Sequence, residues 1–173
     1  MLTAVLSGLL IVASGLSVAQ EREDRLKAEF VERFTHFVTW PEKAPEGAWV
    51  IGVLGPSPMT RELERAFAER RLEERNIIVR RVSRVEDIEQ CHVLYIPSSA
   101  AARVDSILEH TAHLPVLTIS DREGLAERGV LVNFFRDGEY LRFEVNRSAV
   151  AASGLKLSSS LLRMARLVGE DSR

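Results

Sequence analysis

Short, almost wholly apolar runs recur between residues 49 and 145, and segments with helical spacing separate most of them. Apolar residues on both faces of a run are typical of parallel strands that are covered on both sides. Because parallel strands need crossover connections, the alternation predicts a three-layer α/β sandwich with a mostly parallel, six-stranded sheet ending in an antiparallel hairpin at Asp137-Gly138. The predicted strands are Trp49–Leu54, Ile77–Val82, Val93–Ile96, Val116–Ile119, Val130–Phe135 and Tyr140–Val145.

An aromatic helix is predicted before the first of these strands. Over Asp24–Val38, apolar side chains recur at helical spacing, and Trp40-Pro41 is expected to end the helix because proline lacks an amide donor. The stripe consists of Leu26, Phe30, Phe34 and Phe37. We expect it to pack on the sheet; a groove for a partner is the alternative.

Serines stand before three further helical patterns. Ser57 precedes Pro58 at the start of one helix. Ser98 or Ser99 is placed to cap a second helix, which has apolar spacing from Val104 to Thr111 and its limit at Pro115. Ser120 with Glu123 fits a capping box for a short helix that Gly129 ends.

The closing segment, residues 140–168, predicts a strand and two helices. Leu141, Phe143 and Val145 alternate with polar residues, so one face of the last strand is expected to be buried. Asn146 is placed to cap a short helix that ends at Gly154. Beyond it, apolar residues at helical spacing predict a closing helix that packs on the same core. They are Leu161, Leu162, Ala165 and Val168.

The first 19 residues have the pattern of a signal peptide. They contain an uncharged apolar run followed by Ser17-Val18-Ala19, which is typical of a cleavage site. We predict cleavage after Ala19 and a single α/β domain over residues 20–173, exported in soluble form. The segment has no basic residue, so an uncleaved membrane anchor is the alternative.

Cys91 is the only cysteine, and the formal net charge is −2. An internal disulfide is therefore excluded, and we expect Cys91 to lie buried in a strand; an exposed thiol that pairs between chains is the alternative. The charge shows no bias toward nucleic acid, so no nucleic-acid partner is predicted.

A ligand crevice is predicted at the carboxyl ends of the parallel strands, where α/β sheets place their binding sites. Ser57, Ser98, Ser99 and Asp121 follow strand ends and precede helices. Helix N-termini and hydroxyls could converge there on an anion. Alternatively, these residues only cap their helices.

The sequence lacks the motifs of common catalytic sites. It has no G-x-S-x-G elbow, no H-E-x-x-H helix, no Walker loop and no G-x-G-x-x-G turn. The four histidines do not form a ligand set. Cys91 and His92 are expected to be adjacent in a strand and to point to opposite faces, which rules out a bidentate clamp. We therefore predict no enzyme activity, no metal site and no cofactor.

Several separated segments together resemble the YfiR/HmsC-type family of small exported proteins. The matching segments are Lys27–Phe30 with Phe34, Phe37 and Trp40-Pro41, then Ile51–Gly55, Cys91–Pro97, Leu117–Asp121 and Leu141–Ala165. The resemblance implies a periplasmic protein without obligatory cofactor or catalysis. The best-described members repress an inner-membrane diguanylate cyclase through its periplasmic sensor part, and so lower cyclic di-GMP and biofilm formation.

This chain departs from the familiar repressors, which carry more cysteines and can form internal disulfides. The resemblance implies a partner in the periplasmic region of an inner-membrane sensor or diguanylate cyclase, and it leaves a homodimer open. Arg142 and Glu144 are the candidate partner-binding residues, because they are expected on the exposed face of the last strand. A periplasmic solute-binding protein that uses the strand-end crevice is the alternative function.

Overall fold

The computed structural model describes residues 3–72 and 74–169. Its main strands are β2 (Trp49–Leu54), β3 (Arg71–Leu72), β4 (Arg75–Val82), β5 (Val93–Ile96), β6 (Leu117–Ser120), β7 (Val132–Asp137), β8 (Tyr140–Asn146) and β10 (Arg166–Val168). Within these residues they form one eight-stranded sheet in the order β10-β8-β7-β6-β5-β2-β4-β3. The pairs β7–β8 and β3–β4 are antiparallel, and the other neighbours are parallel.

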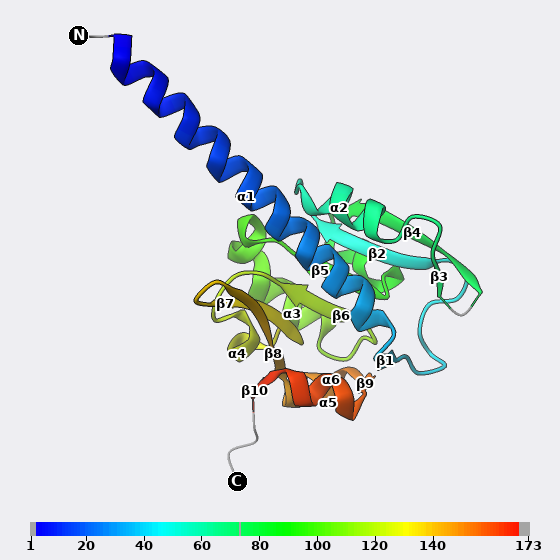
Figure 1. Cartoon of the computed structure of the whole chain (residues 1–173). Coiled ribbons are helices and arrows are strands. Elements are labelled where there is room, and N and C mark those ends of the chain that lie inside the picture. The colour runs from blue at the N-terminus through cyan, green and yellow to red at the C-terminus, as the bar shows by residue number, and fades with distance from the viewer. Residues whose placement is uncertain (1–2, 73, 170–173) are drawn as a thin grey trace.

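The helices cover both faces of this sheet, so the predicted three-layer α/β fold is confirmed (Figure 1). The helices are α1 (Thr3–Thr35), α2 (Met59–Ala66), α3 (Val104–Thr111), α4 (Leu125–Arg128), α5 (Arg147–Ser153) and α6 (Ser159–Met164), with 3₁₀ turns η1 (Val85–Gln90) and η2 (Ser98–Arg103). One core lies between the sheet and α1, α2 and α6, and a second lies under α3, α4 and η1.

The predicted count of six strands is wrong, because the sheet has eight. All six predicted strands are present, but β3 and β10 extend the two ends of the sheet. Two further short strands, β1 (Val38–Thr39) and β9 (Lys156–Leu157), form a separate antiparallel ribbon. These four elements are two or three residues long, too short to leave a periodic signal.

The aromatic stripe of α1 packs on the sheet as predicted, except at Leu26. Phe34 is buried and Phe30 and Phe37 are partly buried, whereas Leu26 is 41% exposed. The helix also ends at Thr35, before the predicted Trp40-Pro41 limit. The chain leaves the helix there because β1 pairs with β9, and the Phe37 carbonyl accepts a bond from Ser158 N at 2.8 Å.

The middle helices begin differently from the predictions. Ser57 Oγ accepts a bond from the Met59 N–H at 3.2 Å, but the 3₁₀ turn η2 separates Ser98 from α3. The predicted capping box at Ser120 is wrong. Ser120 is the last residue of β6, it is buried, and its hydroxyl donates to Ile96 O at 2.8 Å. Gly129 ends α4 as predicted, with φ of 120°.

The closing segment confirms one predicted helix and shortens the other. Asn146 accepts a bond from Ala149 N, and α5 ends at Gly154 in the left-handed region. The closing helix α6 ends at Met164 instead of reaching Val168, which belongs to β10. Leu161 is 1% exposed, so the predicted packing of this helix on the core is confirmed.

Cys91 is buried, as predicted, but its placement in a strand is wrong, because it follows the turn η1 and precedes β5. Its sulfur lies against Gly52 of β2, where an added Cβ would come within 2.8 Å of Cys91 Sγ. This close approach explains the glycine in an otherwise apolar strand. Burial also raises the pKa of the thiol, which keeps it protonated and unreactive.

The predicted cleavage site lies within α1, which Figure 1 shows extending past the sheet toward the N-terminus. Among the described residues, no helix has the length and apolar character needed to cross a membrane. Cleavage after Ala19 stays a prediction.

Candidate functional site

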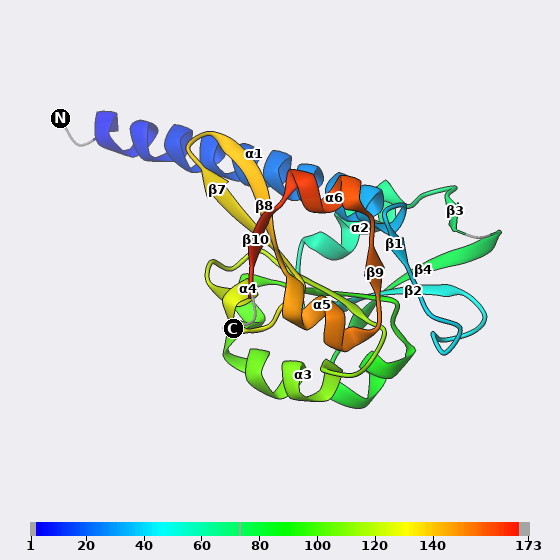
Figure 2. The same ribbon diagram turned by 90° about the horizontal axis from the view of Figure 1, so that it is seen from below.

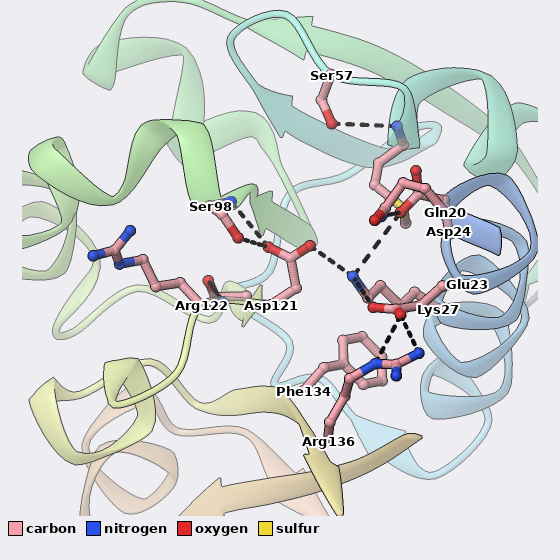
Figure 3. Close-up of polar contacts among 12 residues, drawn as sticks. Gln20, Glu23, Asp24, Lys27, Ser57, Ser98, Asp121, Arg122, Phe134 and Arg136 are labelled. Carbon is pink, nitrogen blue, oxygen red and sulfur yellow. Dashed lines mark hydrogen bonds and ion pairs between the residues drawn. The ribbon is translucent and has the colours of Figure 1, made fainter. Parts of the chain in front are cut away.

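A cluster of charged side chains lies where α1 crosses the carboxyl ends of β5 and β6 (Figure 3). Lys27 is at its centre and is only 4% exposed. The Lys27 Nζ atom lies 2.9 Å from Asp121 Oδ2, 2.9 Å from Glu23 Oε1 and 3.9 Å from Asp24 Oδ1. Burial would lower the pKa of Lys27, but the Asp121 and Glu23 carboxylates raise it overall.

Asp121 joins this cluster to the end of β5. Its Oδ1 accepts bonds from Ser98 N at 2.9 Å and from Ser98 Oγ at 2.8 Å. Burial would raise the pKa of Asp121, but the Lys27 ammonium and the Ser98 donors hold it below its ordinary value. Asp121 is therefore an ionised carboxylate with donors on both oxygens.

Glu23 extends the cluster to the β7–β8 hairpin. Its Oε2 accepts bonds from Arg136 Nε at 3.0 Å and Arg136 Nη2 at 2.7 Å. Burial would raise the pKa of Glu23, but Lys27 and Arg136 lower it overall. Three segments far apart in sequence, α1, the β6 end and β7, are thus tied together by one ion-pair network (Figure 3).

The predicted crevice residues do not form one set. Ser98 and Asp121 are brought together, but Ser57 lies apart and bonds to Met59 N (Figure 3). Ser99 is exposed. The donors of Ser98 point at a carboxylate of the protein itself, so here they hold Asp121 rather than an external anion. Ligand binding by these four residues stays a prediction.

Ser57 lines a separate hollow of about 710 Å³ between α1 and α2, together with Asp24 and Glu62. Burial raises the pKa of the Asp24 carboxyl above its ordinary 3.8, with Gln20 and Lys27 acting in the opposite direction. The Gln20 side chain donates to Asp24 Oδ1 at 2.9 Å.

Replacing Asp24 by Asn should stabilise the protein at pH 7. A carboxyl group whose pKa is raised in the folded state stabilises the fold most at pH values below its unfolded pKa. This stabilisation is lost as the pH rises through the folded pKa. Asn cannot ionise but can still accept the Gln20 bond, so its advantage should shrink as pH falls toward 3.8. Chemical unfolding of both proteins between pH 4 and 7 measures the difference between their free energies of unfolding. A difference that does not change with pH would contradict the prediction. The exposed Glu21→Gln is the matched control.

The two candidate partner residues on β8 differ in exposure. Arg142 is exposed; its Nε donates to Asp137 Oδ2 at 2.8 Å and its guanidinium lies over the Tyr140 ring. Glu144 is only 1% exposed, so the expectation of an exposed side chain is wrong.

Glu144 is buried because β10 lies beside β8. Arg166 of β10 donates through Nε to Glu144 Oε2 at 3.0 Å, and Asn133 Nδ2 donates to Oε1 at 3.2 Å. The Arg166 guanidinium also stacks 3.8 Å from the Phe135 ring centre. Glu144 therefore joins strands within the protein, and Arg142 alone of the pair is placed at the surface.

Lys27, Glu23 and Arg136 are not among the site residues predicted from the sequence. A signal for Lys27 was present, because it precedes the buried Val31 and Phe34 by four and seven residues and so shares their face of the helix. A lysine on the buried face of a helix needs a carboxylate partner.

Comparisons with known proteins identify the family. A family model described as YfiR/HmsC-like matches residues 24–166. No curated protein matches the chain. A crystal structure of a conserved domain protein from Vibrio cholerae O1 biovar El Tor is similar, with a TM-score of 0.59 and 12% identity over 83% of this chain. At that identity the likeness shows the fold alone.

The chain spans 59% of the length of that Vibrio protein. The family match covers the described chain from Asp24 in α1 to the start of β10, and so includes Lys27, Asp121 and the β7–β8 hairpin. This chain therefore belongs to the YfiR/HmsC-like family.

Proposed function

We propose that this protein is an exported, non-catalytic regulator. It binds the periplasmic part of a membrane signalling enzyme, a diguanylate cyclase, and holds that enzyme inactive, which lowers cyclic di-GMP and biofilm formation. The observation that carries the proposal is the family match over residues 24–166. The family is one of periplasmic regulators of this signalling pathway.

The geometry at the carboxyl ends of the strands favours a protein that binds a partner protein over one that binds a small solute. The crevice that a solute would use is occupied by Lys27 and its carboxylate partners. A solute-binding protein also usually closes two lobes around its ligand, whereas the residues described here build one sheet with two cores. The solute-binding alternative therefore has no specific observation in its favour.

Export predicts a defined mature N-terminus. Cleavage after Ala19 would leave Gln20 as the first residue, one helical turn before Asp24 and two before Lys27. Protein recovered from the periplasm should therefore begin at Gln20, which N-terminal sequencing or intact mass measures. Uncleaved chain retained in the cytoplasm would contradict export.

Direct binding tests the proposed partner. The purified protein is titrated by calorimetry with the purified periplasmic region of a membrane diguanylate cyclase from the same organism, one encoded beside its own gene being the first choice. The unrelated periplasmic region of another membrane cyclase is the control. We expect saturable binding to the first region only; its absence would defeat the proposal.

Substitution of Arg142 tests whether this residue takes part in the binding. An exposed charge at an interface rim acts mainly on the association rate and its salt dependence. Arg142→Ala should therefore slow association and flatten its dependence on salt, while Arg163→Ala on α6, also exposed, should leave both unchanged. If both variants associate at the same rate and with the same dependence on salt, Arg142 does not lie in the interface.

A further inference from the structure

The outer edge of β4 is mostly uncovered. On one side β4 pairs with β2 over Ile77–Val82. On the other side β3 reaches only Arg75 and Asn76, where Leu72 and Arg71 are their partners. Figures 1 and 2 show β3 and β4 at the end of the sheet opposite β10. Past Asn76, the described part of the chain supplies no strand to this edge.

The direction of the free backbone groups follows from one hydrogen bond. The Val82 carbonyl accepts from Gly55 N at 2.8 Å, so Val82 points its backbone groups toward β2. Because successive residues of a strand alternate, Ile77, Val79 and Arg81 point their N–H and C=O groups outward. The pairing with β3 ends at Asn76, so Val79 and Arg81 lie past its reach and present donors and acceptors suited to another strand.

A groove of about 540 Å³ adjoins this edge. The end of α2, β3 and β4 line it, with Phe67, Ile77 and Val79 as its apolar residues. On the opposite face of the strand Ile78 is 48% exposed. A strand added to β4 would direct alternate side chains into the groove and over Ile78, so both faces of such a segment would find apolar contact.

The charges at this edge define what fits it. Between Arg75 and Val82 the strand carries three arginines and no acid. Arg70, Arg71 and Arg81 make no ion pair within the described residues, and Arg70 and Arg71 line the groove. Glu64 and Glu69 also line the groove but belong to α2 and the turn after it. Arg75 and Arg80 are bonded within the protein, to Pro45 O at 2.8 Å and to Gln90 Oε1 at 3.0 Å, so Arg81 is the arginine of β4 that is available to a partner. A second copy would bring two Arg81 side chains together, whereas an acidic side chain across from Arg81 would be attracted.

We propose that the open edge of β4, Val79–Arg81, binds an extended acidic segment of a partner protein as an added strand, with apolar side chains of that segment in the Phe67–Val79 groove. The proposal relies on the proposed function only for the existence of such a partner.

Amide hydrogen exchange with a peptide probe tests this surface independently of any cyclase. The probe is a capped peptide of alternating Glu and Val, about eight residues long to match β4. At about ten times its dissociation constant it should slow exchange of the outward amides of Val79 and Arg81 about tenfold. The inward amides of Ile78 and Arg80, already bonded to β2, should change little.

Two control peptides separate the causes. Replacing Glu by Lys tests the charge, and N-methylation of alternate residues removes the backbone donors of the probe. Neither control should protect Val79 or Arg81. No protection by the acidic peptide, or equal protection by all three, would overturn the proposal. Protection that rises with protein concentration alone would assign the edge to a second copy and also overturn it.

A pair of variants gives a second readout on the intact chain. Arg81→Pro removes an outward N–H that β2 does not use, and an edge strand tolerates such a proline. Arg81→Ala removes only the charge. Peptide affinity should fall further with proline than with alanine while both variants keep the wild-type melting temperature. Equal affinities of the two variants would show that no backbone bond forms there. If the peptide binds as expected but the cyclase region does not, the proposed partner fails and this surface stands.

Discussion

Replacing Lys27 by methionine should destabilise the fold by about 3–5 kcal/mol, because removing one partner of a buried ion pair leaves an uncompensated charge. Lys27 is 4% exposed, and the Asp121 side chain keeps 13% of its surface in solvent. Methionine fills a similar volume, so the loss should come from electrostatics rather than from a cavity. Urea unfolding measures the change.

The control for this prediction is on the same helix. Arg25 is exposed, and Arg25→Met should change stability by no more than about 0.5 kcal/mol. In the double variant Lys27→Met with Asp121→Asn, part of the loss should return, since the unpaired carboxylate is gone. A Lys27→Met protein as stable as wild type would show that the cluster does not hold α1 in place.

The same pair predicts a pH window. The pKa of Asp121 is lowered in the folded protein, so its contribution to stability is present above the ordinary value of 3.8 and is lost as pH falls through the folded value. The stability gap between wild type and Lys27→Met should therefore narrow below about pH 4.

Phe34→Ala should have an effect of similar size, about 3–5 kcal/mol, through lost packing. The Phe34 ring is 2% exposed. Its centre lies 4.8 Å from that of Phe143, 5.8 Å from Phe134 and 5.9 Å from Phe30. These contacts join α1 to the antiparallel β7–β8 hairpin, so removing the ring should loosen both elements.

Leu26→Ala is the matched control, because Leu26 lies on the same helix and is 41% exposed. It should cost no more than about 0.5 kcal/mol. Thermal and urea unfolding of both variants measure the contrast. Equal losses would mean that the exposed side of α1 is covered in solution, while a small loss for Phe34→Ala would contradict the described core.

The parts of the fold that could be predicted are those whose signal is local. The bounds of β2 and β5 agree with the predicted Trp49–Leu54 and Val93–Ile96, because a continuous apolar run buried on both faces has little freedom in its limits. The helix from Asn146 to Gly154 was also predictable, since its cap and its left-handed glycine are set by neighbouring residues.

The errors occur where distant segments decide the local structure. Residues 166–168 have the spacing of a continuing helix, yet they form β10 because Arg166 pairs with Glu144 and the backbone pairs with β8. The same pairing buries Glu144, which the alternation of the strand had placed on an exposed face. Strand periodicity assigns faces to residues but does not show which face another element covers.

Only one half of the candidate site could be predicted from the sequence. The rule that parallel strands place their carboxyl ends at one edge brought Ser98 and Asp121 together correctly. The lysine that meets them comes from α1, 94 residues earlier in the chain, and no local pattern states where that helix crosses the sheet. At Asp121 this edge of the sheet therefore holds an internal ion pair, and ligand binding by the predicted crevice residues stays a prediction.

Cellular cyclic di-GMP tests the central claim most directly. Its level is compared in the wild-type strain, in a strain lacking this gene, and in a strain lacking both this gene and the gene of the diguanylate cyclase that the protein binds. The account predicts that cyclic di-GMP rises when this gene is deleted and that the rise disappears when the cyclase is also absent. An unchanged level in the single deletion would contradict it.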